Sequence, residues 1–448
     1  MPERVTERLA QWLSSRDYED LPPEVREKTV EVIFDTVACA IACSRLPEVR
    51  AIVDLVESIG GEPHCSLIGY RAKSSVVNAA MVNGGMARGG EADAVHMTSS
   101  GGHVAPGPVS TALTVGEWLD SSGRDVLRAV ALAYEVGGRL MTIFYRERDY
   151  ITRRFYPTSV IANLTSAIAA GLVLGLDARG LQAALGLAAY QAAGPDNMTK
   201  DPGHMGMTFQ CAAANRNGVT AALLARQGSH VPLDILDGPL GFFDTYLGKP
   251  ELGAELIDGL GSSYSIMDVM YKRYPVGTPN QAYAQGLIGL LERHVVASED
   301  IAAIEIQMPR RSLHTAPKTR HPSIAVDVVS ALAAVERKLD FYRLHDPAGM
   351  TITAELARMQ KKIRFVPRDD WAGTEHNRHA IVTVTTTGGK RLEEDVWFRP
   401  MTRQELGRKF GDLVTPQFGA QRAESLRRAL EGIAGAASVR PLMHSLCA

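Results

Sequence analysis

Residues 155–176, FYPTSVIANLTSAIAAGLVLGL, carry no charge, and a second Ala- and Gly-rich run, LQAALGLAAYQAAG, follows at residues 181–194. The first run is long enough to span a membrane, but Pro157, Asn163 and its many small residues leave it weakly hydrophobic. Small side chains allow helix axes to approach closely. The two runs therefore predict a pair of helices buried at the centre of a large helical domain.

The sequence pattern changes after residue 272. Helical spacing dominates from residue 6 to about residue 261 and returns after residue 402. Between these regions, IAAIEIQM (301–308) alternates as a strand, and AIVTVTTTGGKRLEEDVWF (380–398) reads as a β-hairpin that turns at Gly388 and Gly389. The prediction is a mostly α protein with a smaller α/β part. We place an all-helical domain at residues 1–268, an α/β domain at 269–400, and C-terminal helices at 401–448 that return to the helical domain.

Composition argues against several classes of partner. The 448 residues include 48 Lys and Arg against 50 Asp and Glu, which gives a net charge of −2 and no field for nucleic acid or an anionic membrane. Five scattered cysteines argue against a disulfide framework. Residues 1–10, MPERVTERLA, are charged where a secretory signal needs an apolar stretch, so we expect a cytoplasmic protein.

Residues 84–107, GGMARGGEADAVHMTSSGGHVAPG, form the densest group of unusual side chains. Glu91, Asp93, His96 and His103 lie there in glycine-rich backbone between two helices, and irregular connections of this kind often carry function. A metal site is one interpretation, although the spacing matches no strong metal motif. The alternative is that the glycines serve turns and the histidines bond backbone carbonyls.

Three other segments hold candidates. In RRFYPTS (153–159), Thr158 is expected to cap the following helix and Tyr156 to project from the entering turn. In DPGHMGMTFQ (201–210), the loop residue His204 is a weaker candidate.

The third segment, MYKRYPV (270–276), lies at the joint between the helical and α/β blocks, so cations there are well placed to meet a carboxylate. Its candidate residues are Lys272, Arg273 and Tyr274. The sequence has no P-loop, no GxSxG, no HExxH and no GxGxxG motif, which removes the usual signals for ATP chemistry, serine hydrolysis, zinc proteolysis and dinucleotide binding.

Taken in order, these segments resemble the MmgE/PrpD family, which contains 2-methylcitrate dehydratase, cis-aconitate decarboxylase and iminodisuccinate epimerase. The resemblance rests on FDTVACAIA, VNGGMARGGEADAVH, the 153–194 region, NRNGVTAALLARQG, YKRYPVGTPNQA, VTVTTTGGKR and MTRQELGRKF. It implies a helical domain, an α/β lid, a cleft between them, a homodimer, and chemistry that needs no metal or organic cofactor.

The resemblance also implies site residues. Asp93 matches the family's cleft aspartate, His103 its Gly-loop histidine and Lys272 the lysine of a Lys-x-Tyr-Pro motif. Three positions depart from the pattern. Tyr156 stands where members have histidine, Met97 replaces a threonine, and Met207 falls where a lysine is usual. The loss of a cation and an imidazole leaves fewer positive partners for a tricarboxylate.

Our leading hypothesis is a cofactor-independent lyase of the hydro-lyase type, acting on a small di- or tricarboxylate. Negative charge develops beside a carboxylate in such reactions, so the site needs a base for a carbon-bound proton and cations for the enolate-like state. The alternatives are an isomerase or epimerase of a dicarboxylate, a non-catalytic binding protein and, third, a metal hydrolase. The candidate catalytic residues are Asp93, His103, Tyr156 and Lys272. The candidate substrate-binding residues are His96, Thr158, His204, Arg273 and Tyr274.

Overall fold

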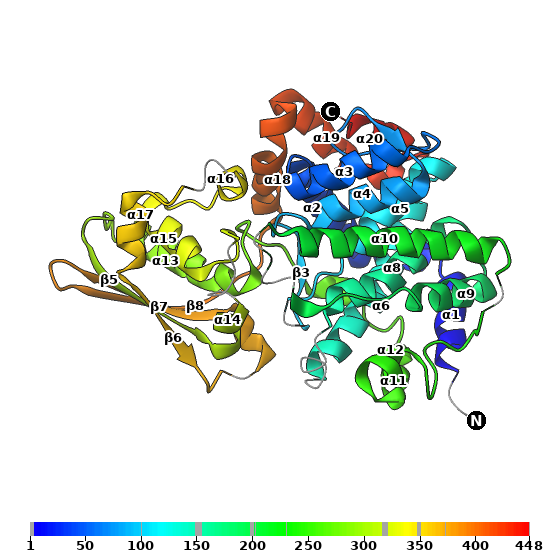
Figure 1. Cartoon of the computed structure of the whole chain (residues 1–448), viewed down its shortest axis with the longest axis horizontal. Helices are drawn as coiled ribbons and strands as arrows, with labels where there is room; N and C mark the ends of the chain where they lie inside the picture. The colour runs from blue at the N-terminus through cyan, green and yellow to red at the C-terminus, as the bar shows by residue number, and fades with distance from the viewer. Residues whose placement is uncertain are drawn as a thin grey trace.

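The computed structural model describes residues 4–99, 101–147, 155–197, 201, 203–229, 231–315, 321–346, 351–371 and 373–447. They form a large helical lobe and a smaller lobe in which helices cover a sheet (Figure 1). The predicted fold class, mostly α with a smaller α/β part, is confirmed.

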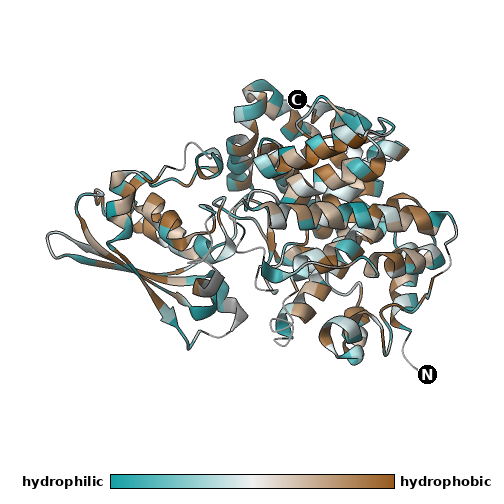
Figure 2. Cartoon of the chain, viewed as in Figure 1, coloured by the Kyte–Doolittle hydropathy of each residue, from teal (hydrophilic) through white to brown (hydrophobic). Residues whose placement is uncertain are grey.

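The larger lobe is built around the two runs that open the sequence argument. Residues 155–176 hold α8 (Pro157–Val173) and residues 181–194 overlap α9 (Ala178–Ala189). Almost every side chain of α8 is buried. Hydrophobic residues run through the helices at the centre of this lobe (Figure 2). None of the helices among the described residues combines the length and the hydrophobicity that a membrane span needs. The prediction of a helix buried at a domain centre is confirmed for α8, whereas α9 is buried over only part of its length and the second run includes the exposed Tyr190.

Helices that precede and follow α8 and α9 in the sequence pack around them. They are α1 (Val5–Ser15), α2 (Pro23–Cys43), α3 (Pro47–Ile59), α4 (Val76–Arg88), α5 (Pro106–Leu119), α6 (Gly123–Arg146), α10 (Met205–Arg226), α11 (Phe242–Leu247) and α12 (Gly253–Ile257). Helix α10 packs so closely on α8 that a Cβ added at Gly218 would lie 2.6 Å from the backbone nitrogen of Ala167. Glycine at this position is a packing requirement.

The smaller lobe holds a four-stranded sheet in the order β6-β5-β7-β8. The strands are β5 (Ile301–Pro309), β6 (Ile363–Arg368), β7 (His379–Thr386) and β8 (Arg391–Trp397), and only the β5–β6 pairing is parallel. The predicted hairpin is the β7–β8 pair, whose turn has Gly389 at φ +81°. The helices that accompany the sheet in the described residues are α13 (Gln281–Arg293), α14 (Arg310–Thr315), α15 (Val326–Glu336), α16 (Phe341–His345) and α17 (Ala354–Gln360).

The two lobes meet through a short sheet and through returning C-terminal helices. Strand β3 (Val95–His96), from the glycine-rich segment, pairs with β4 (Val269–Met270) just before the Lys272 motif. Helices α18 (Arg403–Phe418), α19 (Ala420–Glu431) and α20 (Arg440–Ser445) lie on the larger lobe (Figure 1). The ring of Phe410 in α18 stacks on that of Phe34 in α2, with centroids 4.4 Å apart. The β3–β4 pairing brings together the two segments that carry most candidate residues.

We predict that Gly218→Ala destabilises the protein, because the added methyl group has no space between α10 and α8. Overpacking of this kind costs about 1–3 kcal/mol in free energy of unfolding. The matched control is Gly411→Ala in α18, where an added Cβ meets nothing within 4 Å and alanine favours the helix. Urea denaturation measures both changes. Equal stability of the two variants would contradict close α8–α10 packing.

Candidate active site

A buried arginine organises the glycine-rich segment. Arg88, the last residue of α4, is 1% exposed and donates hydrogen bonds to Glu91 Oε1 at 3.0 Å and Asp93 Oδ1 at 3.3 Å. It also donates to Tyr156 Oη at 3.3 Å. One guanidinium therefore ties two acids and a phenol into a single cluster.

Lys272 reaches the same cluster from beyond β4. Its side chain is fully buried, and Nζ donates to Glu91 Oε2 at 2.6 Å and to the Glu91 carbonyl at 3.1 Å. Although burial acts to raise it, Arg88 and Lys272 hold the pKa of Glu91 well below its usual range. Glu91 itself has a φ of +53°, a conformation that costs free energy in a non-glycine residue and that the two cations hold in place.

Asp93 and His103 form a hydrogen-bonded pair, with His103 Nδ1 2.7 Å from Asp93 Oδ2. Burial and the nearby Arg88 lower the pKa of His103 to about 4, although Asp93 acts in the opposite direction. Burial acts to raise the pKa of Asp93, but His103 and Arg88 bring it below its usual value, so the carboxylate is ionised. A neutral imidazole beside this acceptor carries its proton on Nδ1 and leaves a lone pair on Nε2.

Tyr156 and Thr158 support this pair from the start of α8. Burial raises the pKa of Tyr156 to about 12, so the phenol keeps its proton at neutral pH. The hydroxyl of Thr158 accepts a hydrogen bond from the His103 backbone N–H at 3.3 Å. The predicted helix cap is wrong: Thr158 makes no capping bond, because Pro157 occupies the first helical position and Tyr156 the N-cap.

His204 is the N-cap of α10, and its Nε2 lies 3.3 Å from Glu91 Oε1. Met207, one turn on, places Sδ 2.6 Å from Arg88 Nη2. Of the candidates named from sequence, the structure thus brings Asp93, His103, Tyr156, Lys272 and His204 to one buried cluster, with Thr158 at its edge.

The other three candidates lie outside the cluster. Arg273 pairs with Glu405 of α18 at 3.0 Å, and Tyr274 exchanges backbone bonds with the Gln281 side chain. His96 lies on β3, where its Nε2 is 3.9 Å from Asp268 Oδ2. Arg273 does meet a carboxylate, as cations at a domain joint were expected to, but that carboxylate belongs to the protein.

Three charged residues of the cluster were missed by sequence reasoning. Arg88 was not singled out, because it ends a helix, where a basic residue is common. Its spacing of three and five residues from Glu91 and Asp93 could have indicated an ion pair. Lys409 of α18 lies 2.6 Å from Asp35 Oδ1 and donates to the Ala92 carbonyl at 2.6 Å. No sequence signal joins Asp35 to Lys409, because 373 intervening residues separate them and only tertiary packing brings α2 and α18 together.

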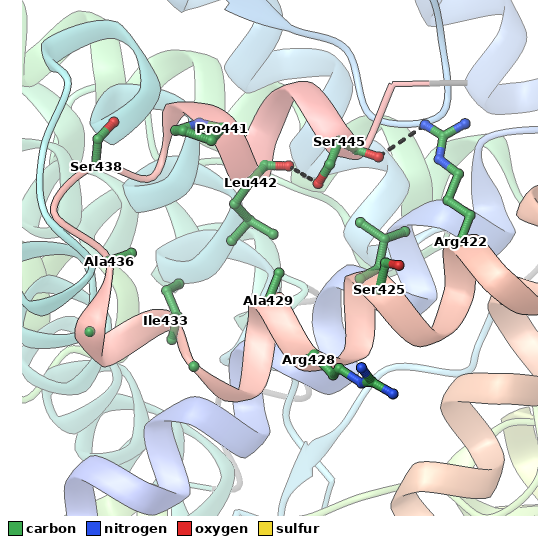
Figure 3. Close-up of a pocket in the computed structure, with 13 residues that line it drawn as sticks. Arg422, Ser425, Arg428, Ala429, Ile433, Ala436, Ser438, Pro441, Leu442 and Ser445 are labelled. Atoms are coloured by element: carbon green, nitrogen blue, oxygen red, sulfur yellow. Dashed lines mark hydrogen bonds between the residues drawn. The ribbon is translucent and has the colours of Figure 1, made fainter.

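Two cavities lie away from these charged groups. One of about 380 Å³ is at the lobe joint, between β3, β4 and the end of β8, with Asp268, Gln281 and Arg378 in its wall. The larger, about 570 Å³, opens between α19 and α20 and is mainly apolar (Figure 3). Among the described residues, no three His, Cys, Asp or Glu side chains are grouped so as to hold a metal ion.

In a comparison with known proteins, each lobe matches a domain model of the same family. Residues 7–255 match the sequence model of the MmgE/PrpD N-terminal domain and residues 274–432 that of the MmgE/PrpD C-terminal domain. Cis-aconitate decarboxylase of Aspergillus terreus is 29% identical over 280 residues, which are 60% of this chain and 56% of that protein. The mouse protein of that name is 24% identical over 348 residues, which are 72% of this chain and 69% of that protein. The chain thus spans little more than half the length of the Aspergillus relative.

We predict that Lys272→Met lowers the free energy of unfolding by about 3 kcal/mol, because it removes one partner of a fully buried ion pair. Arg273→Met is the matched control one residue away. Its pair with Glu405 is partly exposed, so the expected loss is about 1 kcal/mol or less. Chemical denaturation of both variants gives the comparison, and an equal loss would show that burial does not decide the strength of these pairs.

A second prediction concerns the stability of the protein at acid pH. Burial lowers the pKa of His96, His103 and His345 to about 4 and that of His321 to about 2. The unfolded chain binds protons at these groups below pH 6.5 while the folded protein does not, so stability falls as pH drops from about 6.5 towards 4. Denaturation at several pH values measures this slope. His96→Gln should reduce it by about 1.4 kcal/mol per pH unit. A slope unchanged in this variant would contradict a neutral buried His96.

Proposed function

The chain belongs to the MmgE/PrpD family, and from that premise we propose that it is a lyase acting on a small di- or tricarboxylate. The reaction passes through proton transfer at a carbon next to a carboxylate. The observation that carries the proposal is the buried Asp93–His103 pair, 2.7 Å apart, in a cluster that also holds two buried cations.

His103 is the proposed base. Its Nδ1–H is held by Asp93 and its backbone N–H by Thr158, which orients the ring and directs the Nε2 lone pair to the substrate. A neutral imidazole is the correct form for taking a proton from carbon, and its pKa of about 4 keeps it neutral above that pH. As the proton arrives, the Asp93 carboxylate stabilises the imidazolium that forms.

Lys272 is proposed to stabilise the negative charge that develops on the substrate carboxylate. An ammonium group has three N–H donors, and within the described residues two of them are used on Glu91. The third can bond a substrate carboxylate oxygen, and more strongly when that group becomes enolate-like. Tyr156, protonated because its pKa is about 12, is the proposed donor to the departing group or to carbon.

Two observations favour cleavage of different bonds in the substrate. The neutral His103 favours abstraction of a carbon-bound proton followed by loss of water, as in a hydro-lyase. The relatives named cis-aconitate decarboxylase favour loss of CO₂ as a second candidate. In that case the electron pair left on carbon takes up a proton, and His103 must be protonated first or Tyr156 must supply the proton.

We predict that His103→Gln lowers kcat by about 10² or more, since a positioned acid–base group contributes about 10²–10⁴. The assay incubates the protein with citrate, cis-aconitate and 2-methylcitrate in deuterated water and follows water loss, CO₂ release and deuterium incorporation by NMR. The control is His64→Gln, an exposed histidine outside the cluster, which should retain wild-type activity.

The outcomes separate the alternatives. Deuterium exchange with inverted stereochemistry and no bond cleavage would assign an isomerase or epimerase. Ligand stabilisation without turnover of any acid would assign a binding protein. Product formation that persists in His103→Gln would remove the role proposed for this histidine.

A further inference from the structure

We propose that His204, His321 and His345 form a carboxylate-binding site that the α/β lobe, here called the lid, completes, and that this site holds a second carboxylate of the substrate. The inference rests on the proposed function, since it concerns the same buried cluster. It adds two lid residues that sequence reasoning did not identify, and it requires a substrate with at least two carboxylates.

The three imidazoles form a row across the seam between the lobes. His204 begins α10 in the helical lobe, while His321 and His345 belong to the α/β lobe. The ring centroids of His204 and His321 are 4.6 Å apart, and those of His321 and His345 are 5.2 Å apart. His204 is 2% exposed and His321 8% exposed, so neither is a surface histidine.

Helix α16 holds the lid end of this row against the cluster. The Phe341 ring stacks on His345 with centroids 4.4 Å apart and an interplanar angle of 22°. The same ring lies on Gly90, where an added Cβ would come within 2.7 Å of Phe341 Cζ. Because Gly90 precedes Glu91, the lid docks directly on the turn whose carboxylate binds Arg88 and Lys272.

Two imidazoles of this row, those of His204 and His345, have unmet hydrogen-bonding capacity. Within the described part of the chain, His204 Nδ1 and His345 Nε2 are buried without a hydrogen-bond partner. Leaving such an atom unsatisfied costs free energy, so these positions suit a polar ligand. His345 Nδ1 faces the Phe341 carbonyl at 2.9 Å and carries its hydrogen there. Its Nε2 therefore becomes a donor only when the ring is protonated.

Charge explains why binding of an anion here is linked to the uptake of a proton. Among the described residues, the acids near the row include Glu91, already paired with Arg88 and Lys272, and Glu48 and Asp201 beside His204. Burial and the neighbouring imidazoles keep His321 and His345 neutral in the empty protein. A carboxylate within hydrogen-bonding distance favours the protonated form, so its binding is expected to draw about one proton from solvent.

The test is isothermal titration calorimetry of the full chain at pH 6.5 in two buffers that differ in ionisation enthalpy. The probes are propane-1,2,3-tricarboxylate, glutarate and the monocarboxylate butyrate. We expect uptake of about one proton with the first two probes. His321→Gln and His345→Gln should abolish that uptake and weaken both probes tenfold or more, while the weaker binding of butyrate stays unchanged. His64→Gln is the control.

A proton-uptake signal that survives both variants, or an equal loss for butyrate, would overturn the proposal. So would binding of Zn²⁺ alone that these variants abolish while carboxylate binding persists. NMR titration of the wild-type histidine Cε1–H signals with glutarate reads the protonation directly, which keeps the test decisive if a variant fails to fold.

Turnover distinguishes this inference from the proposed function. If His321→Gln and His345→Gln both keep the wild-type turnover rate, KM and proton uptake, the histidine site is ruled out. The lyase assignment is then unaffected. Proton-linked binding of glutarate without turnover of any acid would keep the site and remove the lyase. If wild-type protein neither binds nor converts any of these acids, both proposals fail.

Discussion

The buried carboxylate of Glu91 sets the conditions for the rest of the site. An ion taken out of water costs several kcal/mol unless partners surround it. Here the partners come from the end of α4, through Arg88, and from beyond β4, through Lys272. The pairing requires a left-handed backbone at Glu91 and close docking of the β3–β4 segments. One electrostatic constraint therefore couples the glycine-rich turn to the seam between the lobes.

This constraint also determines how the cluster can receive an anion. Arg88, Lys272 and Lys409 are balanced by Glu91, Asp93 and Asp35, so the cations already have partners. An incoming carboxylate must use spare donors on these cations or bind together with a proton taken up from solvent by a neutral group. The buried imidazoles provide the second route. A mutually paired cluster is thus compatible with an acidic substrate, because binding and protonation are linked.

Both Tyr156 and Met207, two of the positions that depart from the family pattern, contact the Arg88 guanidinium. Where the family resemblance leads one to expect an imidazole and an amine, this chain has a neutral phenol and a thioether beside a buried arginine. Positive charge here is thus concentrated on Arg88 and held by the protein's own acids.

The sequence by itself determined the fold class, the buried α8 helix and the β7–β8 hairpin, because these depend on local periodicity, small residues and turn chemistry. It also singled out residues 84–107, where the structure has a buried charged cluster. It also placed Asp93, His103 and Lys272 among the candidates. Only the tertiary structure decided that Arg88 is the hub, that Lys409 joins Asp35, that Arg273 turns away to Glu405, and that histidines of two lobes form one row. Those facts depend on distances between segments far apart in the chain, and periodicity carries no information about such distances.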